Sequence, residues 1–325
     1  MTGGSGFIGS HLVDLLASED HEVRIVDDLS GGHLSNLNNQ RDNPKVSLYE
    51  QNINLLEANE KVFHKADFCF HLAGIGDIVP SVIKPVEYME TNVQGTVKVL
   101  EASRHFGVKK FIYAASSSCY GLAQAPTDEN HPINPQYPYA LSKYLGEQAA
   151  FHWGKVYGIP TNSICIFNAY GERVRTTGAY GAVFGVFLKQ KLSDKPLTVV
   201  GDGTQLRDFI YVTDVAKAFL SAAETGSMGQ RYNIGSGEPK SINYLVQLLG
   251  AKEIVYVPKR PAEPQVTHAN IGKALHSLGW LPKVHFEVGV NMMINAIEYW
   301  SDAPLWDEFS IANATQKWFE VFKED

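Results

Sequence analysis

The chain has 325 residues, which is long for a single core and predicts one large domain with a smaller lobe, or two domains. Its formal net charge of −7 argues against a nucleic-acid or anionic-membrane surface, because either needs a basic stripe. The sequence shows no apolar run of about 18 residues and no signal-peptide pattern, so we expect neither a membrane span nor export. Three widely spaced cysteines predict no disulfide framework and indicate a reducing cytoplasm.

The chain opens with a glycine-rich loop that runs into a helix expected over residues 7–18. The stretch "TGGSGFIG" places Gly3, Gly6 and Gly9 at G-x-x-G-x-x-G spacing. Glycines at these positions allow a tight turn and let the backbone approach a pyrophosphate at the positive end of the helix. The spacing therefore favours a dinucleotide site, while a plain turn before a helix is the alternative.

A strand expected over 21–28 ends in two acids. Asp27 follows the glycine loop by about 20 residues, where a carboxylate can accept both hydroxyls of an adenine ribose. Asp27 and Asp28 would repel a 2′-phosphate, and the following Leu-Ser-Gly-Gly contains no arginine to hold one. The pattern favours NAD over NADP. Two solvated loop aspartates are the alternative.

The first half of the chain continues as an alternation of strands and helices. Further strands are expected over 45–52, 66–74, 109–117 and 161–171, and further helices over 86–105 and 139–157. The apolar runs of these strands are nearly continuous, as is typical of parallel strands covered on both faces. The alternation predicts an α/β fold with a Rossmann-like doubly wound parallel sheet.

The pattern loosens after residue 170, and this suggests a second unit. Residues 207–224 and 232–237 again resemble strand–helix and strand pieces of the first unit. We therefore assign residues 1–170 plus 207–238 to an NAD-binding Rossmann domain, and 171–206 plus 239–325 to a smaller α/β substrate-binding lobe. Open α/β sheets bind ligands at the carboxyl ends of their strands, so the lobe should close over that edge.

The stretch "PYALSK" places Tyr139 and Lys143 on the same face of the helix expected over 139–157. A tyrosine with the ordinary pKa of about 10 is a poor base at neutral pH. A fixed ammonium and a positive nicotinamide ring would lower that pKa. Such a pair is common on helix surfaces, but "AASSSCYG" ends the preceding strand and supplies hydroxyls where a substrate would lie. This context predicts a catalytic pair.

Five motifs in order carry a family resemblance: the glycine loop, "HLAG" (71–74), "NVQGT" (92–96), "SSSCYG" (116–121) and "YALSK" (139–143). Together they resemble the extended short-chain dehydrogenase/reductase family, and within it the nucleotide-sugar epimerases and dehydratases. The resemblance implies Tyr139 as the catalytic base, Lys143 as its partner and Ser116 as the hydroxyl that orients the sugar 4-OH.

The resemblance also implies two sets of binding residues. For NAD they are Gly3, Gly6, Phe7, Ile8, Gly9, Asp27, Asp28, Asn52, Ile53, Leu72, Ala73, Gly74, Asn92, Tyr139 and Lys143. For the nucleotide-sugar they are Ser116, Ser117, Asn168, Arg207, Arg260, Glu263 and Thr267. Arg207 and Arg260 would clamp the diphosphate with their planar guanidinium forks, and Glu263 would take the ribose hydroxyls.

Departures from the family pattern narrow the reaction. Ser117 and Ser118 stand where the 4,6-dehydratases carry an Asp–Glu pair, and the decarboxylases have Glu at the position of Ser118. The sequence thus argues against elimination and decarboxylation. Asn52 replaces the usual Asp beside adenine, although its amide can still make that contact. Cys165 replaces an Arg, which removes one contact near the site.

We therefore expect a UDP-hexose C4 epimerase that acts through a 4-keto intermediate. Thr267 stands where a large Tyr restricts related enzymes to glucose and galactose, so UDP-Glc/UDP-Gal or UDP-GlcNAc/UDP-GalNAc would fit. The alternatives are a nucleotide-sugar 4-ketoreductase, a C2 or C5 epimerase, and, more remotely, a non-catalytic NAD-binding regulator. Relatives pair two long helices per subunit, which suggests a homodimer through 86–105 and 139–157. The histidines lack zinc spacing, so no metal is expected.

The glycine loop should follow a buried central strand, yet only Met1 and Thr2 precede Gly3. Relatives typically read Val-Thr-Gly-Gly here, and a valine GTG codon also serves as a bacterial start. Our hypothesis is that Met1 stands at that valine in a truncated reading of a longer protein. The alternative is a sheet that closes without most of its central strand, which would leave backbone groups of its neighbours short of partners.

Overall fold

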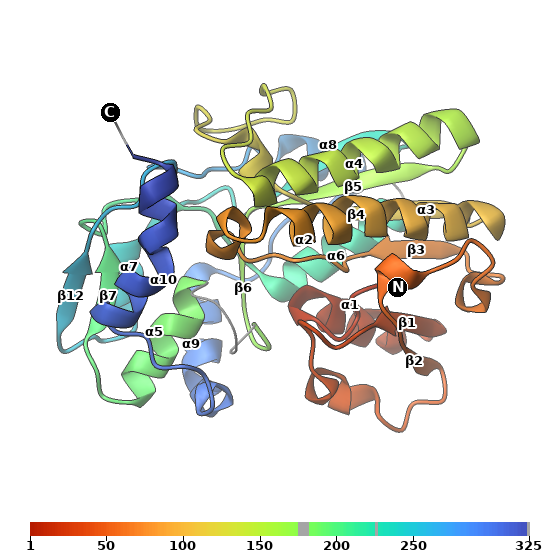
Figure 1. Ribbon diagram of the computed structural model, residues 1–325. Coiled ribbons are helices and arrows are strands. Elements are labelled where there is room, and N and C mark those ends of the chain that lie inside the picture. The colour runs from red at the N-terminus through yellow and green to blue at the C-terminus, as the bar shows by residue number, and fades with distance from the viewer. Residues whose placement is uncertain (175–181, 225–226, 324–325) are drawn as a thin grey trace.

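The computed structural model, shown in Figure 1, describes residues 1–174, 182–224 and 227–323. Its main sheet is parallel and has the order β2, β1, Thr2, β3, β4, β5, β10. The strands are β1 (Val23–Asp27), β2 (Val46–Glu50), β3 (Phe68–His71), β4 (Lys110–Ser116), β5 (Thr161–Ile166) and β10 (Gln230–Ile234). This order is that of a doubly wound sheet and confirms the predicted fold class.

Thr2 holds the central position of the sheet. Its N–H donates to the carbonyl of Phe70 at 2.9 Å, and its carbonyl accepts from the N–H of Leu72 at 3.1 Å. On the other side, the N–H of Gly3 donates to the carbonyl of Val26 at 2.9 Å. The glycine loop therefore leaves the sheet between β1 and β3, where the strand order reverses. The hypothesis about the start of the chain stays a prediction.

Helices cover both faces of this sheet (Figure 1). α1 (Phe7–Ser18) packs against α6 (Val212–Glu224), and α3 (Thr96–His105) packs against α4 (Pro138–Tyr157). Alternate residues of β4 join two separate cores: Ile112 and Ala114 lie in the core of α1 and α6, whereas Phe111 and Tyr113 lie in the other. The inner strands β4 and β5 are thus buried on both faces, as their continuous apolar runs predict, whereas the edge strand β2 is partly exposed.

Two predicted elements are divided in the structure. The helix expected over 86–105 consists of α2 (Pro85–Met89), a π-helical segment (Glu90–Gly95) and α3. The strand expected over 161–171 breaks at Phe167, because the N–H of Asn168 turns away to the carbonyl of Asp208 at 3.1 Å. The chain then continues as β6 (Asn168–Tyr170), which pairs with β9 (Phe209–Tyr211).

A second group of elements packs beside the carboxyl edge of the sheet. It contains α5 (Val183–Leu192), β7 (Leu197–Val200), β8 (Leu206–Arg207), β11 (Lys240–Ser241), α7 (Ile242–Leu248), β12 (Ile254–Val257), α9 (Phe286–Asn295) and α10 (Glu308–Val321), while α8 (Gly272–Leu278) packs against β10 and α6. Rings of Phe209 and Phe286 stack at 5.0 Å in its core. Residues 175–181 of the predicted lobe lie outside the described residues, and the domain boundaries stay a prediction. No described helix has the length and apolar character needed to cross a membrane.

Candidate active site

A cavity of about 910 Å³ has both the glycine loop and the predicted arginine clamp in its walls. The predicted residues that line it are Gly3, Gly6, Phe7, Ile8, Gly9, Asp27, Asp28, Asn52, Ile53, Leu72, Ala73, Gly74, Ser117, Asn168, Arg207, Arg260, Glu263 and Thr267. Ser116, Tyr139, Lys143 and Asn92 stand next to these residues and are not themselves part of the lining. The structure thus brings the predicted cofactor and substrate residues to one continuous space.

The glycine loop is packed so tightly that side chains would not fit. A Cβ on Gly9 would lie 2.0 Å from the carbonyl oxygen of Gly3, and Gly3 itself has a φ of +72°. α1 begins after Gly6, which has no side chain to cap the helix. The free N–H groups of a first helical turn are satisfied by caps, water or ligands. This loop therefore fits the pyrophosphate of a dinucleotide.

The two acids at the end of β1 are held in place by the loops around them. Asp27 accepts hydrogen bonds from the backbone N–H groups of Ser5 and Leu29, both at 2.9 Å. Burial raises the pKa of Asp27, and these two bonds act in the opposite direction. Asp28 accepts from the Nδ2 of Asn52 at 2.7 Å. The amide of Asn52 is thus engaged with Asp28, and its predicted contact with adenine stays a prediction.

Asn92 lies behind the cavity wall and holds the segment around Ile75 by hydrogen bonds. Its Oδ1 accepts from the N–H of Ile75 at 2.8 Å, and its Nδ2 donates to the carbonyl of Ile75 at 3.1 Å. The same Nδ2 donates to the hydroxyl of Ser142 on α4 at 2.9 Å. Asn92 therefore ties the segment after Gly74 to the helix that carries Tyr139. Its direct contact with a cofactor stays a prediction.

Ser116 lies at the end of β4, and Tyr139 and Lys143 lie in the first turns of α4. Burial raises the pKa of Tyr139 to about 12, while the hydroxyl of Ser116 acts in the opposite direction. The sequence led us to expect a lowered pKa, but burial outweighs the protein's own favourable contacts. A positive charge beyond those of the chain, such as that of nicotinamide, is needed to bring this pKa down.

Lys143 is almost fully buried, with 8% of its surface exposed. Its Nζ lies 4.7 Å from the ring centroid of Tyr113. Burial lowers the pKa of Lys143 to about 8, while the carboxylate of Glu147 on the same helix raises it. Glu147 in turn forms an ion pair with Arg231 and accepts a hydrogen bond from Ser163 at 2.5 Å. Sequence reasoning did not identify Glu147, although it follows Lys143 at helical spacing.

The two arginines predicted to clamp a diphosphate lie close together, with Glu263 between them, and their role as a clamp stays a prediction. The guanidinium of Arg260 lies 2.8 Å from one carboxylate oxygen of Glu263, and that of Arg207 lies 3.7 Å from the other. Beside them, the hydroxyl of Thr267 donates to the Oδ1 of Asn168 at 2.7 Å. The five predicted substrate residues of this region therefore lie in two contacting groups on the same cavity wall, and the ribose contact of Glu263 stays a prediction.

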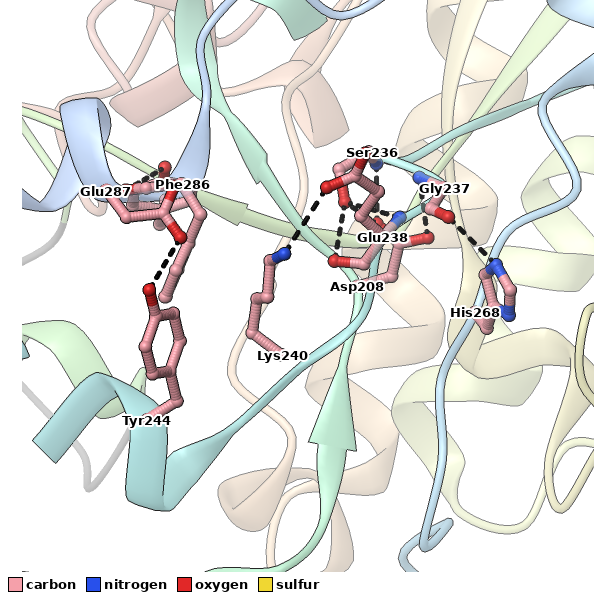
Figure 2. A network of polar contacts seen from close by, with 10 residues as sticks. Asp208, Ser236, Gly237, Glu238, Lys240, Tyr244, His268, Phe286 and Glu287 are labelled. Atoms are coloured by element: carbon pink, nitrogen blue, oxygen red, sulfur yellow. Dashed lines mark hydrogen bonds and ion pairs between the residues drawn. The ribbon is translucent and has the colours of Figure 1, made fainter. Parts of the chain in front are cut away.

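Asp208 fixes the backbone around the clamp, as Figure 2 shows in part. It is fully buried and accepts hydrogen bonds from the hydroxyl of Ser236 at 2.7 Å and from the backbone N–H of Ala269 at 2.8 Å. Its own N–H donates to the hydroxyl of Thr267 at 3.0 Å. Asp208 thus joins three chain segments at the residue after Arg207. The sequence "LRDF" places an aspartate directly after Arg207, but because such pairs are common on protein surfaces, it does not predict a buried Asp208.

Sequence reasoning also missed several cavity residues. They include Asp77, Ser118, Tyr137, Phe187, Val200, Ala303, Pro304 and Trp306. Tyr137 stands two residues before Tyr139 and could have been noticed there. Ala303, Pro304 and Trp306 come from the C-terminal part of the chain, and no local pattern marks them as part of a site.

Comparison with known proteins agrees with this geometry. The model of the NAD dependent epimerase/dehydratase family matches residues 1–235. The chain is 36% identical over 303 residues to a putative UDP-glucose 4-epimerase of Methanocaldococcus jannaschii, covering 91% of this chain and 96% of that protein.

Two solved structures are similar over almost their whole length. A UDP-glucose 4-epimerase from Thermotoga maritima with UDP-glucose has a TM-score of 0.85 and 35% identity, covering 93% of this chain and 97% of that one. A UDP-glucuronic acid 4-epimerase from Bacillus cereus in complex with UDP-glucuronic acid and NAD has a TM-score of 0.86 and 31% identity, covering 91% and 98%. The predicted family and NAD as cofactor are confirmed: the chain belongs to the NAD-dependent epimerase/dehydratase family.

Proposed function

We propose that this NAD-dependent nucleotide-sugar epimerase inverts C4 of a UDP-hexose, with Tyr139 as the group that removes the 4-hydroxyl proton. The observation that supports this most directly is that the hydroxyl of Ser116 acts on the phenol of Tyr139, which lies one helical turn from the buried Lys143. These side chains adjoin a cavity that also contains the glycine loop and the arginine clamp. Proton removal at one hydroxyl and anchoring of a nucleotide diphosphate are the two tasks that this reaction requires.

The chain's own residues divide these tasks. Ser116 orients the sugar 4-hydroxyl toward Tyr139, and Lys143 remains an ammonium below its pKa of about 8, next to the path of the proton. Arg207 and Arg260 hold the diphosphate. Because the binding energy resides in the nucleotide, the sugar is held loosely enough to present either face.

The glycine loop and the pair Asp27 and Asp28 would hold NAD, which supplies hydride acceptance from C4 and hydride return to the opposite face. Two opposite transfers need no net oxidant. We therefore expect turnover without added cofactor when the protein is isolated with NAD bound. Net consumption of NADH or NADPH would instead indicate the 4-ketoreductase alternative.

We propose that the sugar site accepts both plain and N-acetylated hexoses. Thr267 is small and is engaged with Asn168 at 2.7 Å, so it leaves room for a C2 substituent. Ser117 and Ser118 lack the acid and base that elimination or decarboxylation requires. A C2 or C5 epimerase on the same scaffold would give different products, which identify it directly.

The test is incubation of the protein with UDP-glucose, UDP-N-acetylglucosamine and UDP-glucuronic acid without added NAD, followed by NMR analysis of the products. A C4 epimer of at least one is the expected result. Absence of any C4 epimer from all three would contradict the proposal. Tyr139→Phe should abolish turnover and retain NAD, whereas a non-catalytic NAD-binding regulator would show no turnover to lose.

We further propose that the protein is a cytoplasmic homodimer. Leu141, Leu145 and Val156 are 40%, 37% and 53% exposed on α4, which gives this helix an apolar outer stripe. The three cysteines of the chain are free thiols, as suits a reducing compartment such as the cytoplasm. Light scattering should report a dimer, and Leu145→Glu should shift it toward monomer. A wild-type monomer at micromolar concentration would contradict this part of the proposal.

A further inference from the structure

Tyr137 occupies a position in the cavity that the roles described so far leave unassigned. It directly precedes Pro138, the first residue of α4, is 9% exposed and contributes to the cavity lining. The hydroxyl of Ser118 and the charges of Arg207 and Glu263 act on its phenol. The hydroxyl of Tyr137 therefore lies between the serines at the end of β4 and the diphosphate clamp.

The ring of Tyr137 is fixed by two aromatic neighbours. It is stacked with the ring of Tyr139 at a centroid distance of 6.5 Å and an interplanar angle of 9°. The indole of Trp318 on α10 packs on it at 5.2 Å. The indole N–H of Trp318 donates to the carbonyl of Pro261 at 3.0 Å, next to the clamp residue Arg260. An aromatic ring held by such contacts keeps its hydroxyl in one place.

The phenol of Tyr137 acts as a neutral hydrogen-bonding group. Burial raises the pKa of Tyr137 well above its ordinary value, against the lowering effects of Ser118 and Arg207. A phenol that stays protonated offers one donor and accepts as well. Tyr137 therefore does not compete with Tyr139 as a base.

We propose that Tyr137 is a sugar-binding residue, whose hydroxyl hydrogen-bonds the hexose between Ser118 and the diphosphate clamp, and that Trp318 of the C-terminal helix holds it there. The inference rests on the proposed function, because that function places C4 of the sugar at Ser116 and Tyr139 and the diphosphate at Arg207. The part of the ligand that spans these two places is the hexose ring. Tyr137 lines the cavity, with Ser118 and Tyr139 acting on its phenol from one place and Arg207 and Glu263 from the other.

The test compares Tyr137→Phe with wild type in binding UDP and a UDP-hexose, UDP-glucose or UDP-N-acetylglucosamine, by calorimetry on NAD-loaded protein. Loss of one hydrogen bond should weaken binding of the UDP-hexose about fivefold and leave UDP within about twofold. Tyr157→Phe is the matched control, since Tyr157 ends α4 and is 48% exposed. Unchanged affinity for the UDP-hexose, or an equal loss for UDP, would overturn the sugar assignment.

The support by Trp318 has its own test. Trp318→Leu removes the ring that packs on Tyr137 and should weaken UDP-hexose binding without weakening UDP binding. Phe309→Ala is the control on the same helix, because Phe309 is 76% exposed. If folded Trp318→Leu binds the UDP-hexose like wild type, the proposed role of Trp318 is wrong. Should Trp318→Leu unfold, Trp318→Phe removes the bond to Pro261 and keeps a ring; weaker affinity for the UDP-hexose in that variant would support the role of Trp318, and wild-type affinity would show that the bond to Pro261 does not position Tyr137.

Binding and turnover separate this inference from the proposed function. If wild type forms a C4 epimer and Tyr137→Phe binds UDP-hexose like wild type, only the role of Tyr137 is wrong. If wild type binds UDP-hexoses in a Tyr137-dependent way and forms no C4 epimer, the role in binding stands and the proposed reaction fails.

Discussion

Lys143 and Glu147 lie four residues apart on α4, both buried, and the carboxylate partly offsets the loss of hydration that lowers the pKa of the ammonium. Glu147 is itself balanced by Arg231, which packs over the ring of Tyr120 with its guanidinium 5.6 Å from the centroid. A buried charge is stable only when it is paired and hydrogen-bonded. The ion pair of Glu147 and Arg231 therefore helps to keep Lys143, the proposed partner of Tyr139, charged.

Glu147→Gln should lower the pKa of Lys143 further below about 8, because the opposing charge is removed. Lys143 would then lose its proton at lower pH, and the alkaline limb of kcat/KM should move down by about one pH unit. The pH profile of kcat/KM measures this. Glu101→Gln is the control, since Glu101 lies on α3 with Arg104. An alkaline limb at the wild-type pH in Glu147→Gln would contradict the electrostatic role.

Gly9→Ala should abolish NAD binding. The added carbon would lie 2.0 Å from the carbonyl oxygen of Gly3 and 2.9 Å from the Cα of Gly4, so the loop must open. Backbone of the loop cannot move aside without losing its fit to the pyrophosphate. Equilibrium dialysis against NAD, with Ser18→Ala at the exposed end of α1 as control, checks this. Retention of wild-type affinity in Gly9→Ala would show that the loop is not the pyrophosphate site.

His71 should make the protein sensitive to acid. It is hydrogen-bonded to Thr2 at 2.7 Å and to Thr96 at 2.9 Å. Burial, followed by the charge of Lys143, lowers its pKa to about 3. Between about pH 6.5 and 3 the unfolded chain binds a proton at this residue and the native chain does not, so stability falls as pH falls.

This contribution amounts to about 2 kcal/mol between pH 6.5 and 5. The free energy of unfolding, measured with urea at pH 7 and pH 5, should fall by this amount in wild type and in the control His64→Gln, whose position is exposed. In His71→Gln the difference between the two pH values should be smaller by that amount. An equal difference in all three proteins would show that His71 does not remain neutral in the native state.

Local patterns were sufficient for much of the fold and for the first part of the site. The helix predicted over 7–18 is α1. The glycine before it marks its start, and the periodic apolar residues mark its length. Ser116 lies near Tyr139 because the end of β4 packs against the first turn of α4, and Lys143 follows one turn later on that helix. Both inferences rest on short-range spacing, which the chain order preserves.

What the sequence did not reveal depends on contacts between distant segments. The strand breaks at Phe167 because the N–H of Asn168 donates to the carbonyl of Asp208, and no residue type marks that position in the sequence. Trp318 reaches Tyr137 from the end of the chain. Likewise, ligand atoms of Glu19, His21 and Glu224 lie within 4.8 Å of one another on the surface, although only two of these residues are neighbours in sequence. Exposed acidic groups of this kind are common without a bound ion, and the prediction of no metal stays untested.

Glu263 lies between Arg207 and Arg260 and lowers the net charge of the proposed clamp. With its carboxylate ionised, the three side chains carry one net positive charge, and in Glu263→Gln they would carry two. All three are largely buried, with 15%, 16% and 20% of the side chains of Arg207, Arg260 and Glu263 exposed, so the change is weakly screened by solvent.

Inorganic pyrophosphate should therefore inhibit Glu263→Gln more strongly than wild type, by about fivefold at low salt and less as salt is added. UDP should gain less than pyrophosphate does, because the same substitution removes the carboxylate proposed to take the ribose hydroxyls. Competition assays with both ligands measure the two effects separately. Glu238→Gln is the control, since the Glu238 side chain is 70% exposed and pairs with Lys240. If pyrophosphate inhibits all three proteins equally, the two arginines do not form the diphosphate clamp.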